Sequence, residues 1–91
     1  MARNVTAVYS GTFDPLTLGH EDVVRRAALM FDQVVLAVAT AHHKNTLFTL
    51  EQRLEQARAA LADCPNVRVL PFEGLIVDFV RQQGAQVIVR G

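Results

Sequence analysis

The sequence predicts an α/β fold in which helices cover a doubly wound parallel sheet. Two observations predict it. Short apolar runs of the β type alternate with amphipathic helical segments along the chain. One of these runs, Gln33–Ala39, is almost continuously apolar, as expected of a strand covered on both faces. Strands that alternate with helices in this way are parallel and are joined by right-handed crossovers.

The first half of the chain contains two strands and one helix. Val5–Tyr9 is a short, mostly apolar run that ends at Ser10-Gly11. From Glu21 to Phe31 the apolar residues recur on one helical face, which predicts an amphipathic helix. The second strand, Gln33–Ala39, follows it, and a polar stretch separates that strand from the next helix.

The second half repeats this alternation. Thr49 and Gln52 have the spacing of a capping box, so a helix begins there and continues until Pro65-Asn66. Val67–Leu70 is the third strand, a short third helix over residues 75–80 closes at Gly84, and Gln86–Val89 is the fourth strand. The order βαβαβαβ is Rossmann-like. We expect one domain over residues 1–91, truncated after the fourth strand.

Composition excludes several classes of function. Hydrophobic residues make up 51% of the chain, enough to build a core, and 9 basic residues balance 9 acidic ones. Without a basic stripe, binding to duplex nucleic acid or to an anionic membrane is not expected. The single cysteine, Cys64, has no partner for an internal disulfide, and no apolar run has the length of a signal peptide or a membrane span. We therefore expect a cytoplasmic protein.

The loop after the first strand carries the strongest functional signal. Ligands of open parallel sheets bind outside the carboxyl ends of the strands, and Ser10–His20 lies at such an end. Gly11 permits a sharp turn and a close approach, Thr12 offers a backbone N–H and a hydroxyl, and Gly19 leaves room beside the backbone. His20 stands at a helix start, where free N–H groups favour an anion. Neither of the two better-known phosphate motifs, GxxxxGK[ST] and GxGxxG, is present here.

Each candidate also has an ordinary structural explanation. The loop itself has the composition of a turn-rich connection with a polar helix start. Lys44 is a lone charge in a polar loop, and the adjacent His42 and His43 have no third ligand that would make a metal site. Ile76 fits the core of the third helix equally well. Arg90 ends a buried type of strand, so its charge needs water or an anion.

The motifs resemble those of a known superfamily. Gly11–Pro15 followed by Thr17–His20 is similar to the signature of the [HT]-x-G-H nucleotidyltransferases, and within them most similar to the bacterial phosphopantetheine adenylyltransferases. The motif Thr17–His20 begins with threonine, whereas several other enzymes of the superfamily have histidine at that position. Lys44 followed by Phe48–Arg53 resembles the family pattern K-x-x-x-F-[ST]-x-x-x-R, and Val87–Gly91 resembles its V-x-V-R-G.

The resemblance implies a reaction and a nucleotide site. The family transfers AMP from ATP to 4′-phosphopantetheine, giving dephospho-coenzyme A and pyrophosphate in coenzyme A biosynthesis. On the ATP side the resemblance implies Thr12 with Phe13 beside it, His20 at the phosphates and the transition state, and Gly91 near the nucleotide. Mg²⁺ is expected to arrive with ATP, without a protein ligand.

The same resemblance implies an acceptor site and an assembly. Thr12 and Lys44 would contact the acceptor phosphate, Arg90 would lie on the same substrate, and Ile76 would line the pantetheine arm. Catalysis is thereby assigned to His20 and Lys44. The family is hexameric, so a homo-oligomer is expected, and the isolated 91 residues are expected to be inactive.

Two alternatives differ from this assignment. Another nucleotidyltransferase of the superfamily would share the loop chemistry but use a different acceptor. A nucleotide-binding module would hold ATP or coenzyme A without turnover.

Overall fold

A computed structural model of the chain describes residues 4–41 and 45–90. Its strands lie in one parallel sheet in the order β3-β2-β1-β4, which confirms the predicted α/β fold. In chain order the elements are β1 (Thr6–Gly11), α1 (Leu18–Met30), β2 (Gln33–Ala39), α2 (Leu50–Ala60), β3 (Val67–Phe72), α3 (Ile76–Gln82) and β4 (Val87–Val89).

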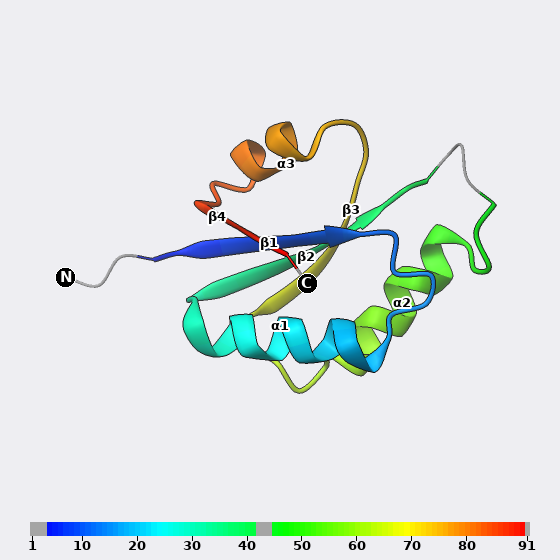
Figure 1. Ribbon diagram of the computed structural model, residues 1–91, viewed down its shortest axis with the longest axis horizontal. Helices are drawn as coiled ribbons and strands as arrows, with labels where there is room; N and C mark the ends of the chain where they lie inside the picture. Colours follow the sequence, from blue (N-terminus) through cyan, green and yellow to red (C-terminus); the bar gives the residue numbers. More distant parts are fainter. Residues whose placement is uncertain (1–3, 42–44, 91) are drawn as a thin grey trace.

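The sheet lies between two layers of helix. Helices α1 and α2 cover one face and α3 covers the other (Figure 1). Alternate residues of β2 point to opposite faces, so Leu36 joins the core beneath α1 and α2, whereas Val35 and Ala37 pack with Phe79 of α3. The nearly continuous apolar run in the sequence is explained by this two-sided burial.

Two strands are longer than the sequence predicted. β1 continues beyond Tyr9 to Gly11 because Ser10 and Gly11 still pair with β2. β3 continues beyond Leu70 through Pro71 to Phe72. Proline is tolerated there because β3 is an outer strand, where a missing N–H breaks no ladder bond.

The helix boundaries differ as well. Helix α1 begins at Leu18 rather than near Glu21, because Thr17 caps it. Helix α2 begins after the predicted cap, Thr49, with Gln52 completing the capping box, but it ends at Ala60, before the Pro65-Asn66 pair. Among the described residues, no helix is long and apolar enough to span a membrane.

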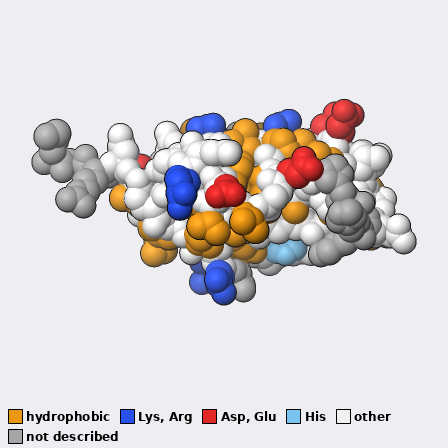
Figure 2. Space-filling view, turned by 90° about the horizontal axis from the view of Figure 1, so that it is seen from above, with side chains coloured by type: hydrophobic (Ala, Val, Ile, Leu, Met, Phe, Trp, Pro, Cys, Tyr) orange, Lys and Arg blue, Asp and Glu red, His pale blue; other side chains and the backbone are white. Residues whose placement is uncertain are grey.

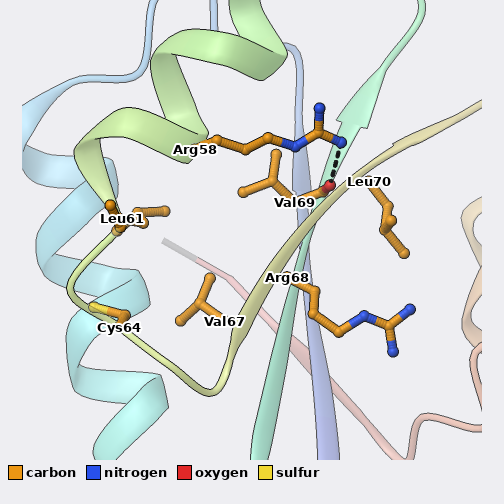
Figure 3. Close-up of a pocket in the computed structure, with 8 residues that line it drawn as sticks. Arg58, Leu61, Cys64, Val67, Arg68, Val69 and Leu70 are labelled. Atoms are coloured by element: carbon orange, nitrogen blue, oxygen red, sulfur yellow. Dashed lines mark hydrogen bonds between the residues drawn. The ribbon is translucent and has the colours of Figure 1, made fainter.

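The outer strand β3 is partly covered along its free edge. The Arg58 guanidinium reaches over from α2 and donates to the Val69 carbonyl at 2.9 Å, on the rim of a cavity of about 340 Å³ (Figure 3). An outer strand presents unpaired backbone groups that can recruit another chain, and a charged side chain laid along it reduces that hazard.

The other outer strand, β4, is bordered by an open groove on the side of α1. A groove of about 390 Å³ separates it from α1, and the apolar side chains of Met30 and Ile88 are exposed near this groove. Apolar side chains also reach the surface on the side of α3, where Leu75 and Val77 are exposed (Figure 2).

An ion pair joins α1 to the turn that follows α2. Arg25 donates from both terminal nitrogens to the Asp63 carboxylate, at 2.9 and 3.0 Å, and to the Ala60 carbonyl at 3.1 Å. The hydrogen bonds from Arg25 lower the pKa of Asp63 below its ordinary value. A carboxylate whose pKa is lowered by folding stabilises the folded state above its unfolded pKa, and this contribution is lost as the pH falls through the folded pKa.

We predict that Asp63→Asn removes part of the acid sensitivity of folding. The variant should be less stable than the parent at neutral pH, and the difference should shrink in acid, as the pH falls through the lowered pKa of the folded parent's Asp63 carboxylate. Urea unfolding at several pH values measures this. A stability difference that stays constant from neutral to acid pH would contradict the assignment.

Candidate active site

An open cavity lies where β1 ends and α1 begins. Its volume is about 520 Å³. It lies at the carboxyl end of a central strand, next to the N-terminus of a helix, which is the expected place for an anionic ligand in this fold. The lining residues are Tyr9, Ser10, Thr17, Gly19, His20 and Val23.

A reciprocal pair of hydrogen bonds orients His20. The Thr17 hydroxyl accepts from the His20 backbone N–H at 3.2 Å, and the Thr17 N–H donates to His20 Nδ1 at 3.0 Å. His20 thus takes the place that glutamate or glutamine has in the usual capping box. Because Nδ1 is an acceptor here, a neutral ring carries its proton on Nε2. The Nε2–H group is then a donor that can serve a phosphate oxygen.

Aromatic packing holds the same ring from the side of the core. The His20 ring meets Phe13 edge to face, with centroids 5.0 Å apart, and Phe13 meets Tyr9 in a similar way at 5.3 Å. Burial raises the pKa of Tyr9 above its ordinary value, so its hydroxyl stays protonated well beyond neutral pH and can donate a hydrogen bond. His20 is therefore fixed by its cap and by its aromatic neighbours together.

Gly11 and Phe13 pack against each other in this loop and so have a structural role. A Cβ on Gly11 would lie 3.0 Å from the Phe13 ring, so this ring occupies the space that the sequence suggested for an approaching ligand. Phe13 is 4% exposed and belongs to the core. Any contact between Phe13 and a nucleotide therefore has to come from its backbone.

Gly19 is different, because it borders the cavity. A Cβ there would meet only the Thr17 hydroxyl, at 3.6 Å, which is an ordinary contact. The fold itself therefore accepts a side chain at this position. What glycine adds is open space beside the backbone, as the sequence predicted.

Polar contacts join the loop after β1 to the segment that precedes α2. The Asp14 carboxylate accepts from the N–H groups of Leu47 and Phe48, at 2.5 and 2.8 Å. Arg53 of α2 is 2% exposed, and its guanidinium donates to backbone carbonyls on both sides of the junction. The acceptors are Thr12 at 2.9 Å, Ala39 at 2.7 Å, Thr40 at 3.3 Å and Phe48 at 3.3 Å.

The remaining predicted site residues are distributed around this edge of the sheet. Thr12 is half-buried between Gly11 and Phe13, and its carbonyl is directed to Arg53. Arg90 follows β4 and lines the groove beneath α1, a different cavity from that of His20. Ile76 packs against the core cluster of α3, as its ordinary explanation required.

Lys44 and Gly91 lie outside the described residues, as do His42 and His43. Within residues 4–41 and 45–90, no three His, Cys, Asp or Glu side chains are grouped so that they could hold a metal ion.

Sequence reasoning missed the roles of Asp14, Thr17 and Arg53. A signal existed for Arg53, because it shares a helical face with Leu50, Leu54 and Ala57, where a charge is out of place. The cap at Thr17 was hidden because histidine is not the residue that completes a usual capping box. Asp14 entered the sequence analysis only as a member of the Gly11–Pro15 string, with no role for its carboxylate.

Comparison with known proteins identifies the family. Residues 8–91 match the model of the Cytidylyltransferase-like family, so the chain belongs to that family. It is 62% identical over 88 residues to a phosphopantetheine adenylyltransferase of Acidovorax sp. (strain JS42), and 60% identical over 84 residues to the enzyme of that name from Methylobacillus flagellatus. These alignments cover 97% and 92% of the chain but 53% and 52% of the relatives, so the chain spans about half their length.

Solved structures agree with this assignment. The fold is similar to that of NadR protein in complex with NAD and AMP-PNP, with a TM-score of 0.70 and 28% identity over 78% of this chain and 21% of that one. A bifunctional NMN adenylyltransferase/ADP ribose pyrophosphatase from Francisella tularensis has a TM-score of 0.67 at 19% identity, over 89% of this chain and 25% of that one. The second likeness shows the fold alone.

We predict that Thr17→Ala destabilises the protein through its cap. Losing the hydroxyl that accepts from the His20 N–H should cost about 1 kcal/mol. Thr17→Ser is the matched control, because it keeps the hydroxyl and should lose much less. Thermal unfolding of the two variants beside the parent measures the difference, and equal midpoints for the alanine and serine variants would contradict the role of the cap.

Proposed function

We propose that these residues form the N-terminal half of a phosphopantetheine adenylyltransferase. The enzyme transfers AMP from ATP to 4′-phosphopantetheine and yields dephospho-coenzyme A and pyrophosphate. The observation that carries the proposal is the close sequence identity to curated enzymes of that name over nearly the whole chain. The oriented His20 beside an open cavity at the end of β1 supports it.

The chemistry requires little from the protein beyond placement. An oxygen of the acceptor phosphate attacks the α-phosphorus of ATP and forms a new P–O bond. The bond from that phosphorus to the bridging oxygen breaks, and pyrophosphate leaves with its electron pair. Because the acceptor phosphate is already an anion at neutral pH, the step needs no general base. Catalysis then consists of aligning two polyanions and stabilising the charge that develops between them.

His20 is the donor that we place at the ATP phosphates. Its Nε2–H is available because Nδ1 is engaged by the Thr17 N–H. The N-terminus of α1 adds free N–H groups at the same position. The backbone N–H and hydroxyl of Thr12 complete this side of the proposed site, with Phe13 contributing through its backbone and Gly91 following β4.

The acceptor is assigned to Thr12, Lys44, Arg90 and Ile76. Lys44 and Arg90 would neutralise its phosphate, and Ile76 at the start of α3 would border the pantetheine arm. The proposal also includes Mg²⁺ carried by the phosphates of ATP, a homo-oligomer, hexameric by resemblance, and a cytoplasmic location. Mg²⁺ bound in this way commonly keeps water and substrate oxygens as most of its ligands.

Product analysis tests the proposed function. The protein in its complete natural form is incubated with ATP and 4′-phosphopantetheine, and pyrophosphate and dephospho-coenzyme A are measured. Release of pyrophosphate that depends on the acceptor is expected, whereas the 91 residues alone should turn over at a negligible rate. Nicotinamide mononucleotide serves as the competing acceptor. Turnover with that acceptor alone would identify another nucleotidyltransferase, and ATP binding without product would identify a binding module.

We predict that His20→Ala lowers kcat by about 100-fold or more, the usual effect of removing one transition-state donor. His20→Asn is the matched variant, because its side-chain oxygen can still accept from the Thr17 N–H while the Nε2 donor is lost. Both variants should therefore lose turnover, but the asparagine variant should retain more of the cap's stability. Steady-state kinetics with thermal unfolding measures both effects, and wild-type kcat in either variant would refute the role of His20.

A further inference from the structure

Arg53 occupies an unusual environment for an arginine. It lies on the buried face of α2, 2% exposed, and within residues 4–41 and 45–90 its guanidinium donates to four backbone carbonyls. Those carbonyls belong to three separate segments: the loop after β1, the end of β2 and the segment that precedes α2. A single side chain therefore connects the ends of two neighbouring strands to the start of a helix.

Burial of a guanidinium is costly, so its position needs an explanation. Arginine is almost never fully buried unless it is paired, because removing its charge from water is unfavourable. An apolar side chain on the same helical face would fill the core without that cost. The fork of N–H donors is what an apolar residue lacks, and this fork fixes the distances between the carbonyls that it joins.

Asp14 adds a second connection between the same segments. Its carboxylate accepts from the N–H groups of Leu47 and Phe48, while the Phe48 carbonyl accepts from Arg53 Nε at 3.3 Å and from the Thr46 hydroxyl at 2.8 Å. The backbone around Phe48 is thus held through both its N–H and its carbonyl. It is attached to the loop after β1 on one side and to α2 on the other.

We propose that Arg53 is a positioning residue that fixes the loop after β1 against the segment between β2 and α2. Thr12 lies on the first of these, and Thr40 and Phe48 of the second precede and follow Lys44 in the sequence. If the proposed function is right, Arg53 thereby sets the separation between the nucleotide and the acceptor phosphate. It contacts neither substrate itself. Its effect is transmitted through the carbonyls of Thr12, Thr40 and Phe48.

The test compares Arg53→Lys and Arg53→Met with Arg58→Met in the complete natural form of the protein. Arg58 is the matched control, because it lies on the same helix and also donates to a carbonyl, but it is exposed and lies over the free edge of β3. Arg53→Lys should lower kcat per folded molecule by about 100-fold, the scale expected of a small misplacement of reacting groups. The dissociation constants of ATP and of 4′-phosphopantetheine, measured separately, should change by less than about fivefold, since each loop keeps its own contacts.

Several outcomes would overturn the proposal. If kcat per folded molecule in Arg53→Lys equals that of Arg58→Met, Arg53 contributes only to stability. If the affinity for one substrate falls as much as kcat does, Arg53 acts on a single loop and not on the separation of two.

Hydrogen exchange distinguishes a failure of this inference from a failure of the proposed function. In the wild-type protein the amides of Leu47 and Phe48 should exchange at least about tenfold more slowly than in an unstructured peptide, because Asp14 accepts from both. Exchange at unprotected rates would show that the connection does not exist in solution. If the amides are protected but no adenylyl transfer occurs with either acceptor, the proposed function fails while the connection stands.

Discussion

The burial of Arg53 beneath the ends of β1 and β2 is the constraint on which the candidate site depends. Parallel strands end with backbone carbonyls and N–H groups that the ladder no longer satisfies, and a loop that leaves a strand needs other partners. Here one guanidinium serves the carbonyls of Thr12, Ala39 and Thr40. Hydrogen bonds from a charged donor are worth about 1.5–3 kcal/mol each, enough to offset much of the cost of burying the charge. The loops that carry the predicted substrate contacts are thereby attached to α2.

Most of the fold could be predicted from the sequence because its signals are local. The strand Gln33–Ala39 follows from its nearly continuous apolar run, the stripe on α2 from helical periodicity, and the cap at Thr49 from the spacing of a capping box. The errors occur where tertiary contacts decide. β1 and β3 extend because neighbouring strands offer pairing, and α1 begins early because His20 substitutes for glutamate or glutamine in a capping box. The strand pairing is not contained in any local pattern, and the cap at Thr17 is local but has histidine where the usual pattern has glutamate or glutamine.

The candidate site could be located from the sequence, but its construction could not. The loop after β1 was found because Gly19 and His20 have the residue types that phosphate binding needs, and the cavity lies beside them. Asp14 accepts hydrogen bonds from residues that lie 33 and 34 positions further along the chain. Arg53 donates to a carbonyl that lies 41 positions away. Contacts over such sequence separations produce no regular spacing of residue types that could be recognised in the sequence. For Arg53 the visible signs were its charge on an apolar helical face and its place at the end of the family pattern, and neither sign shows what the side chain contacts.

The conformation of Phe13 connects the core to the proposed chemistry. Its φ is +50°, a left-handed backbone that costs a side-chain-bearing residue roughly 1–2 kcal/mol. Burying a phenylalanine side chain contributes about 1.5–3 kcal/mol, so the core can offset the strain. In that position the Phe13 ring covers Gly11 and presents its surface to the His20 ring. Residues of the motif that a ligand cannot reach are therefore as necessary as those that it can, because they determine where the His20 donor points.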